Sequence, residues 1–395
     1  MKILLVNIFY NEEGGAQKST TLLAEQLVKE GHEVSVYSID TDKPVNEKKN
    51  GVQIFRRNTT TFDLNYIFKT RKNRFKHLFY KFFEVFNKSA ERNFEEILDV
   101  VQPDVIHFNC LSGMSLGIIE IAKSRGIKTV LTLRDYWLET PWGTKNNFIV
   151  NGMNRRLEPK VKRALSFVDI VTAPSAFTLN HFIEKEYFNS SHQICEVVEN
   201  AVTFSQKNLK KIIDEKRSIV HNMDTRFLFV GSILRQKGIF KMVEAFKELS
   251  AYPNITLDIV GKGADLQELK AEIESDSRIK YLGFKSNPDL NNIYRSADVL
   301  VVPSDWDEPF GRVAIEGNSN GLPVIGSNRG GIPEIVHTTK GGEVFDISSI
   351  STFVEVMKKF IEMPNYNIYF DSILETIDTY QIEKQSEKFV KLYQK

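Results

Sequence analysis

Two glutamates, Glu308 and Glu316, flank a short segment that contains Pro309, Phe310 and Gly311. Proline and glycine at these places are typical of a loop that turns into a helix, where backbone N–H groups and the helix dipole attract an anion. A carboxylate before the helix and another in its second turn can hold the hydroxyl groups of a ligand lying over the helix start. The alternative for these residues is an acidic helix cap followed by a solvated glutamate.

Small residues occupy two further strand-to-helix turns. Gly330 and Gly331 follow one predicted strand, and Gly15 and Ala16 open the helix after the first strand of the chain. Without a Cβ atom, the backbone can approach a phosphate closely, but ordinary turns use the same residues. The chain contains no Gly-x-Gly-x-x-Gly pattern, which argues against a nicotinamide or flavin enzyme.

Two cations, Arg235 and Lys237, lie just after the predicted strand that ends at Gly231. Cations at the carboxyl edge of a parallel sheet can neutralise a diphosphate leaving group, although a solvated basic loop has the same composition. No Asp-x-Asp pair and no cluster of histidines and cysteines demands a metal ion, so we expect none in the site.

The elements that must position these residues are short, continuous apolar runs separated by stretches of helical periodicity. Such runs are typical of parallel strands covered on both faces, and their alternation with helices predicts doubly wound α/β domains. The pattern restarts at Arg226, so we expect two such domains, with a polar, Lys-rich hinge from Thr203 to Asp224 and a final amphipathic helix from Ile382 to Tyr393. The predicted strands are residues 3–6, 34–37, 105–108, 129–133 and 170–173, then 226–231, 257–261, 280–283, 299–302 and 323–326.

The composition agrees with two globular domains. The chain has 395 residues, and its 52 Lys and Arg nearly balance its 51 Asp and Glu, so a nucleic-acid partner is not indicated. The cysteines, Cys110 and Cys195, suggest no disulfide framework, and no apolar stretch is long enough to span a bilayer. We therefore expect a cytoplasmic protein, at most attached to the inner face of the cell membrane.

Taken together, these motifs resemble those of the glycosyltransferase family 4 group of GT-B enzymes. An E-x7-E motif falls at Glu308 and Glu316, and a G-G-I-P-E motif falls at Gly330 to Glu334. The N-terminal glycine pair, the segments 132–137 and 173–175, and the R-x-K-G stretch at Arg235 follow in the order of the family. The resemblance spans nearly the whole chain.

The resemblance implies a retaining transferase that needs no metal or other cofactor, with the nucleotide-sugar as a substrate. It implies two Rossmann-like domains facing a central cleft: residues 1–203 on the acceptor side, 204–375 as the donor domain, and 376–395 as a C-terminal helix packing back toward the first domain. Glu308 would contact the donor sugar, Glu316 the ribose, and Arg235 and Lys237 the diphosphate. The other expected donor-binding residues are Gly15, Ala16, Gly231, Phe284, Phe310, Gly311, Arg312, Gly330 and Gly331.

Two positions depart from the family pattern. Arg134 stands where many members have histidine, and Ser232 stands where many have arginine. A guanidinium cannot act as a general base, but Arg134 can bind a phosphate or an anionic acceptor, and Arg235 can replace the cation missing at Ser232. No carboxylate is obviously placed as a nucleophile, so we expect same-face attack and list Glu308, Lys237, Arg235 and Arg134 as the catalytic set.

The acceptor is expected to be a glycan, a lipid-linked molecule or another hydroxyl compound, and UDP is expected over GDP from its frequency in the family. The segment from Lys69 to Arg92 interleaves basic and aromatic residues at helical spacing, which suits an anionic membrane surface or, equally, a helix packed into the first domain. The alternatives to a transferase are a GT-B sugar-nucleotide epimerase, a non-catalytic sugar-nucleotide or glycan-binding protein and, with least support, a nucleic-acid-binding module.

Overall fold

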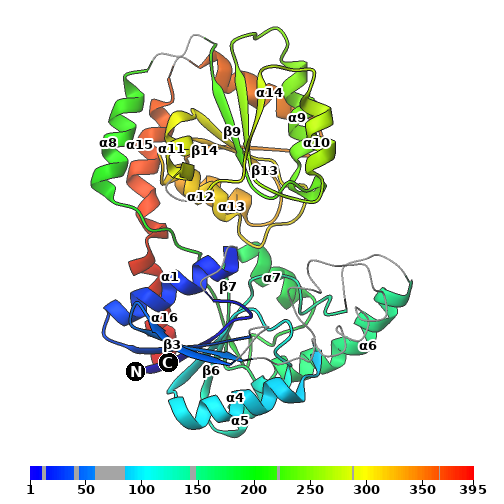
Figure 1. The fold of residues 1–395 in the computed structure, drawn as a ribbon, viewed down its shortest axis with the longest axis vertical. Coiled ribbons are helices and arrows are strands. Elements are labelled where there is room, and N and C mark those ends of the chain that lie inside the picture. The colour runs from blue at the N-terminus through cyan, green and yellow to red at the C-terminus, as the bar shows by residue number, and fades with distance from the viewer. Residues whose placement is uncertain are drawn as a thin grey trace. The chain divides into compact units, whose positions relative to one another are not determined.

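The computed structural model describes residues 1–10, 15–39, 44–57, 85–142, 148–219, 223–286, 289–363 and 365–395. The chain divides into two compact units (Figure 1). Unit 1 consists of Met1–Ala201 and Gln385–Lys395, and unit 2 consists of Val202–Lys384. The C-terminal helix α16, Ile382–Gln394, begins in unit 2 and belongs to unit 1 from Gln385 onward.

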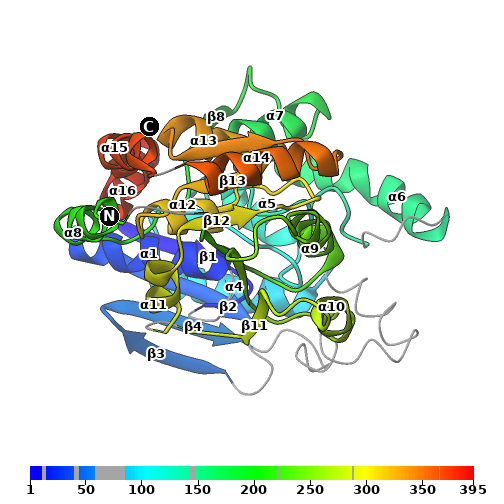
Figure 2. The same cartoon turned by 90° about the horizontal axis from the view of Figure 1, so that it is seen from above.

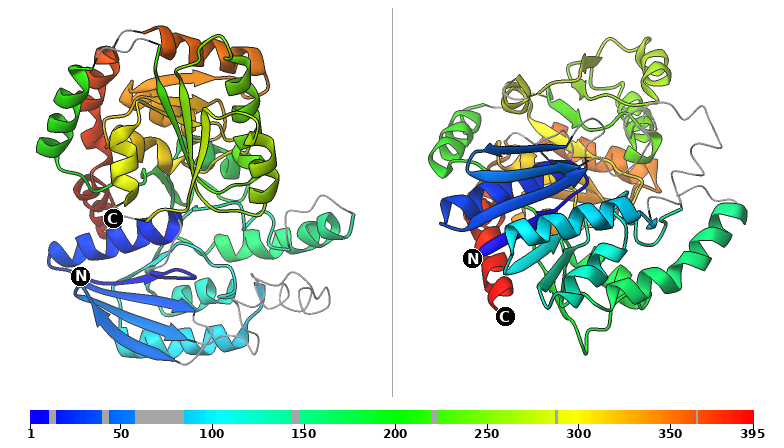
Figure 3. Two further views of the ribbon diagram at one scale, coloured as in Figure 1. Left: turned by 45° about the horizontal axis from the view of Figure 1, so that its top comes forward. Right: turned by 60° about the horizontal axis from the view of Figure 1, so that its bottom comes forward.

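Unit 1 is built on an eight-stranded sheet in the order β3-β4-β2-β1-β5-β6-β7-β8. Neighbouring strands are parallel except β3, which pairs antiparallel with β4 at one edge; Figure 3 shows these strands from two further directions. The strands are β1 Lys2–Val6, β2 Glu33–Ile39, β3 Val45–Lys49, β4 Val52–Arg57, β5 Val105–Phe108, β6 Lys128–Thr132, β7 Ile170–Ala173 and β8 Ile194–Val197.

Helices cover both faces of this sheet because its central strands are apolar on both sides. One core cluster joins the sheet to α4, α5, α6 and α7. A second cluster, on the other face, contains Leu23 and Leu27 of α1 together with Phe389 and Leu392 of α16. The helices are α1 Gly15–Lys29, α4 Lys88–Val101, α5 Gly117–Ser124, α6 Phe148–Leu165 and α7 Ala176–Glu184.

Unit 2 has a six-stranded parallel sheet in the order β11-β10-β9-β12-β13-β14 (Figure 2). Its strands are β9 Arg226–Val230, β10 Thr256–Val260, β11 Ile279–Gly283, β12 Val299–Val302, β13 Val324–Ser327 and β14 Gly342–Phe345. Its helices are α8 Gln206–Arg217, α9 Ile239–Glu248, α10 Leu266–Ile273, α11 Asp289–Ser296, α12 Arg312–Asn318, α13 Ile332–Thr339, α14 Ile350–Glu362 and α15 Asn367–Thr376, with 3-10 turns η1 Arg235–Lys237 and η2 Ile377–Tyr380.

The predicted fold class, two doubly wound α/β halves, is confirmed. The polar segment Thr203–Asp224, predicted as a hinge, contains helix α8. Ser205 caps this helix by accepting a hydrogen bond from the Asn208 amide, and Leu209, Ile212 and Ile213 are buried at helical spacing. The second unit runs to Lys384, beyond the expected boundary at residue 375.

Candidate functional site

The strongest sequence motifs converge at the carboxyl ends of three neighbouring strands of unit 2. Turn η1 follows β9, the loop 303–311 follows β12, and residues 328–331 follow β13, and these three strands are adjacent in the sheet. Ligands of open α/β sheets bind at this edge, so the strand order itself brings Lys237, Glu308 and the glycine pair to one place.

Lys237 and Glu308 are in direct contact. The Lys237 Nζ lies 2.5 Å from Glu308 Oε1, and both side chains are partly accessible, 23% and 16% exposed. The hydroxyl of Ser304 donates to the same carboxylate oxygen at 3.0 Å, and Lys237 Nζ also lies 4.8 Å from the centroid of the Trp306 ring. The site therefore presents a cation and an oriented carboxylate side by side.

Backbone packing fixes the turn that carries Lys237. Gly238 has a φ of +72°, and a Cβ atom there would lie 1.6 Å from the carbonyl oxygen of Pro303. The Asp305 amide donates to the Gln236 carbonyl at 2.9 Å. Turn η1 and the loop after β12 thus hold each other in place, which pre-orients the ammonium.

The glycine pair lies against the main chain of Glu308. Gly330 has a φ of +58°, and a Cβ atom there would lie 2.1 Å from the Glu308 carbonyl oxygen and 2.4 Å from its nitrogen. The Gly331 amide donates to that carbonyl at 2.8 Å. The close approach of these glycines is to the loop that carries Glu308, and their predicted contact with a phosphate stays a prediction.

Glu316, on α12, is held by two side chains. Its Oε1 lies 3.1 Å from Nε of Arg312, one helical turn earlier, and its Oε2 accepts from the Tyr294 hydroxyl at 3.4 Å. Burial and the neighbouring Glu316 raise the pKa of Tyr294 well above its ordinary value, so the hydroxyl keeps its proton and donates. Gly311, with a φ of +92°, caps the helix start against Ile332.

Other expected donor-binding residues do not join this cluster with their side chains. Arg235 forms an ion pair with Glu268 of α10, and its guanidinium lies 4.5 Å from the Phe240 ring centroid. The Phe310 side chain is buried, with its ring centroid 6.0 Å from that of Tyr380.

The remaining two predicted positions of unit 2 lie after β9 and at the end of β11. The Gly231 amide donates to the Val260 carbonyl at 3.0 Å. Phe284 is exposed beyond β11, and Lys262 Nζ lies 4.1 Å from its ring centroid. An accessible ring at the carboxyl edge of the sheet is available for a ligand.

Sequence reasoning gave no role to Ser304, Trp306 or Tyr294, which contact the three key charged groups. The first two lie inside the segment before Glu308, so their position in that loop was a usable signal. Tyr294 sits on α11, and no spacing rule connects it to Glu316.

The predicted residues of unit 1 lie at the carboxyl ends of its own strands. Gly15 is the first residue of α1, followed by Ala16, and a Cβ atom at Gly15 would meet no other atom within 4 Å. Arg134 follows β6 and is buried. Its Nε donates to Asn109 Oδ1 at 3.0 Å, and its Nη1 donates to Asn200 Oδ1. The proposed donor role of Gly15 stays a prediction from the resemblance.

A buried polar chain underlies the Arg134 region. His107 Nδ1 lies 2.7 Å from the Tyr393 hydroxyl of α16, and its Nε2 lies 2.6 Å from Thr132 Oγ1. Burial, with a smaller contribution from the charge of Arg134, lowers the pKa of His107 well below its ordinary value, so the ring is neutral. Burial likewise raises the pKa of Asp135.

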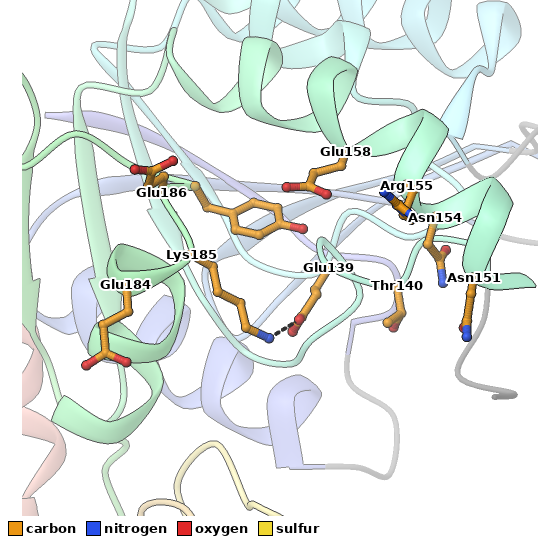
Figure 4. A pocket seen from close by; sticks show the side chains of 10 residues that line it. Glu139, Thr140, Asn151, Asn154, Arg155, Glu158, Glu184, Lys185 and Glu186 are labelled. Carbon is orange, nitrogen blue, oxygen red and sulfur yellow. Dashed lines mark hydrogen bonds and ion pairs between the residues drawn. The ribbon is translucent and has the colours of Figure 1, made fainter.

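Unit 1 also contains a polar pocket of about 610 Å³ beside α6 (Figure 4). Lys185 and His181 both contact the Glu139 carboxylate, His181 Nε2 at 2.8 Å. Burial alone would raise the pKa of Glu139, but these hydrogen bonds outweigh it and hold the pKa below its ordinary value. Amides and charges of α6 line the other side, namely Asn151, Asn154, Arg155 and Glu158.

The predicted membrane segment from Lys69 to Arg92 lies mostly outside the described residues, which resume at Val85. Among the helices that the structure describes, none combines the length and apolarity needed to cross a bilayer.

Comparisons with known proteins decide the family. Residues 13–206 match the family described as Glycosyltransferase Family 4, and residues 211–372 match Glycosyl transferases group 1. The chain is a family 4-type glycosyltransferase. The resemblance inferred from the motifs is confirmed, and the two matches divide the transferase close to the boundary between its units.

The transferase is similar to relatives along most of its length. It is 28% identical to a 42.6 kDa protein in the cps region of Klebsiella pneumoniae, covering 90% of this chain and 94% of that protein. It is 27% identical to a glycosyltransferase of Methanocaldococcus jannaschii, covering 86% and 84%.

Solved structures show the GT-B fold. Sucrose-phosphate synthase from Thermosynechococcus elongatus matches with a TM-score of 0.74 at 18% identity, covering 99% of this chain and 98% of that one. Anabaena HepE, solved with UDP and glucose, matches with a TM-score of 0.69 at 15% identity, covering 100% and 99%.

Proposed function

We propose that this transferase moves a sugar from a UDP-sugar to a hydroxyl group of a glycan acceptor, with retention of configuration. The observation that carries the proposal is the contact between Lys237 and Glu308 at the carboxyl edge of the unit 2 sheet. A diphosphate needs a cation, and a sugar needs an oriented hydrogen-bond acceptor. Support for UDP comes from HepE, whose structure contains UDP and glucose.

Lys237 stabilises the departing diphosphate, since the negative charge on that group grows as the bond to the sugar C1 breaks. Glu308, oriented by Ser304 at 3.0 Å, accepts hydrogen bonds from the sugar hydroxyls. Glu316, oriented by Arg312 at 3.1 Å and by Tyr294, accepts from the ribose diol. Positioning and charge stabilisation then supply most of the rate enhancement.

The acceptor oxygen attacks C1 on the face from which the diphosphate leaves. The C1–O bond to the diphosphate breaks, a C1–O bond to the acceptor forms, and the acceptor proton passes to a phosphate oxygen. This route needs no enzyme nucleophile and no buried general base, which agrees with an arginine at position 134.

The reaction is proposed to need no metal ion. Asp305 and Asp307 form an Asp-x-Asp pair beside the site, but the Asp305 carboxylate already lies 2.8 Å from Lys241 Nζ and 3.7 Å from Arg329 Nη2. Two cations therefore already neutralise the Asp305 carboxylate, which leaves it a poor ligand for a divalent ion. Transfer rates that stay the same after EDTA treatment support this assignment, and a loss restored by Mg²⁺ or Mn²⁺ contradicts it.

The polar pocket of unit 1 is the proposed site for the acceptor glycan. Its amides, carboxylates and cations donate and accept hydrogen bonds in close succession, as a hydroxyl-rich ligand requires, and its size fits the range of small-ligand sites. The relative in a cps region supports polysaccharide biosynthesis as the setting. A cytoplasmic location is proposed, with both cysteines as free thiols.

The test begins with thermal unfolding of the full chain against UDP- and GDP-sugars, because a donor stabilises the fold according to its occupancy. The stabilising donor is then incubated with candidate acceptors, and NMR gives the anomeric configuration of the product. An α-linked product from an α-linked donor supports the proposal. Inversion contradicts retention, and interconversion of nucleotide-sugars without an acceptor would establish an epimerase instead.

A further inference from the structure

Helix α6 of unit 1, Phe148–Leu165, has two sides of opposite character. Leu157, Val161, Ala164 and Leu165 are buried and attach the C-terminal half of the helix to the core. The N-terminal half extends away from the sheet of unit 1, as Figures 1, 2 and 3 agree. Its solvent-facing side therefore has no packing role within the unit.

The first residues of α6 are large and apolar, yet they are exposed. Phe148 is 92% exposed and Ile149 is 69% exposed. Single exposed apolar residues are common on protein surfaces, but two adjacent ones at the end of a projecting helix form a compact apolar tip.

Basic residues continue this side of the helix. At 100° per residue, Arg163 and Arg156 lie about 60° and 80° around the helix from Phe148, between the directions of Phe148 and Ile149. The buried Val161 and Leu165 lie on the opposite side of the helix. Both arginines are exposed. Arg163 Nε lies 3.8 Å from Glu120 Oε1 of α5, whereas no acid among the described residues forms an ion pair with Arg156. The one acid of α6, Glu158, points to the pocket side, where it lies 2.9 Å from Lys162.

An apolar tip followed by a cationic stripe matches an anionic lipid surface. The apolar side chains can enter the acyl boundary while the arginines meet the headgroups. A second copy of the same stripe would be repelled by its like charge, and nucleic acid gives no reason for the exposed Phe148 and Ile149.

We propose that the outer side of α6 docks the protein on an anionic membrane. The surface is defined by Phe148, Ile149, Arg156 and Arg163. It is separate from the candidate donor site and does not depend on the transfer reaction. The side of α6 that carries Glu158 lines the polar pocket, so docking would hold that pocket beside the lipid surface.

The test is sedimentation of the full chain with phosphatidylcholine vesicles, with and without phosphatidylglycerol. The parent protein should bind the anionic vesicles and much less the neutral ones. The double variant Phe148→Ser/Ile149→Ser should bind at least about tenfold more weakly. Arg156→Gln/Arg163→Gln should lose about fivefold per arginine and most of its sensitivity to salt.

A matched control is Ile368→Ser, because Ile368 of α15 is 68% exposed but lies in unit 2. It should bind like the parent protein. Unchanged circular dichroism and unchanged nucleotide-sugar binding would show that the α6 variants remain folded. No binding by the parent protein overturns the proposal, as does equal binding by the parent and both α6 variants. Transfer assays with a water-soluble acceptor test the proposed function separately.

Discussion

The Lys237 ammonium lies 2.5 Å from the Glu308 carboxylate, and this contact joins the loops that follow β9 and β12. Each side chain restricts the conformations of the other. Gly330, in the turn after β13, packs closely against the main chain of Glu308. Three neighbouring strands thus fix one cation and one carboxylate without help from a ligand. Such pre-orientation reduces the cost of arranging the groups during the reaction.

Replacing Lys237 with methionine should lower kcat/KM for the nucleotide-sugar by about 100-fold or more, because it removes a cation from the developing diphosphate charge. Glu308→Gln should also reduce transfer while leaving the fold intact. Lys247→Met is the control, since Lys247 forms a 2.5 Å pair with Glu272 elsewhere in unit 2. Steady-state kinetics with unchanged thermal unfolding would support the assignment; parent-like rates in both site variants would refute it.

Gly330→Ala should destabilise unit 2 by at least about 2 kcal/mol, because a methyl group would collide with the Glu308 backbone and the positive φ disfavours alanine. Activity should fall because the Glu308 loop must shift. Gly152→Ala tests the generality of the effect: its Cβ would meet no other atom within 4 Å, and it lies inside α6. The free energy of unfolding of Gly152→Ala should rise by about 0.5–1 kcal/mol. Calorimetry measures the stability of both variants. A Gly330→Ala protein as stable as the parent would contradict the prediction.

Acidification should lower the free energy of unfolding of unit 1, because buried His107 is neutral in the folded state. The folded pKa lies below the unfolded value of about 6.5, so the unfolded chain binds more protons at acid pH. The contribution is complete above pH ~6.5 and is lost below it, at up to about 1.4 kcal/mol per pH unit. Thermal unfolding should be measured above and below pH ~6.5. The stability lost on acidification should be smaller in His107→Asn than in the parent protein, whereas Tyr393→Phe should lose as much stability as the parent. Identical pH dependence in His107→Asn would exclude this residue as the cause.

Lys185→Met should raise the acceptor KM about tenfold without changing the donor KM, because it releases Glu139 in the polar pocket. Lys123→Met is the matched control, since Lys123 forms a similarly accessible pair with Asp169, at 2.7 Å, outside the pocket. Initial rates over both substrate concentrations separate the two constants. A change confined to the donor KM would place the acceptor elsewhere.

The sequence was sufficient for the central strands because each is a short apolar run, buried on both faces. It did not reveal β3, whose residues Val45–Lys49 are all exposed and which forms only by pairing with β4. It also missed α8, because many lysines mask the buried positions Leu209, Ile212 and Ile213. Whether such an element forms depends on strand-pairing and packing partners that are distant in the sequence, and local composition does not reveal these partners.

Motif spacing and resemblance predicted that Lys237 and Glu308 lie near each other, and the two are in contact because their loops follow adjacent strands. Their roles in transfer stay predictions. Spacing and resemblance did not predict the ion pair between Arg235 and Glu268. Which acid an arginine pairs with depends on distances in the folded structure, and the sequence does not give these distances. The contact of Tyr294 with Glu316 was equally hidden, since α11 and α12 meet only through the fold.

The placement of Gln385–Lys395 within unit 1 has a consequence for synthesis of the chain. Phe389 and Tyr393 cover part of one face of the unit 1 sheet, beside α1, and the Tyr393 hydroxyl contacts buried His107. As the chain emerges from the ribosome, unit 2 has all of its strands before unit 1 receives these residues. Part of the apolar face of unit 1 therefore stays uncovered until unit 2 and the C-terminal helix have been translated.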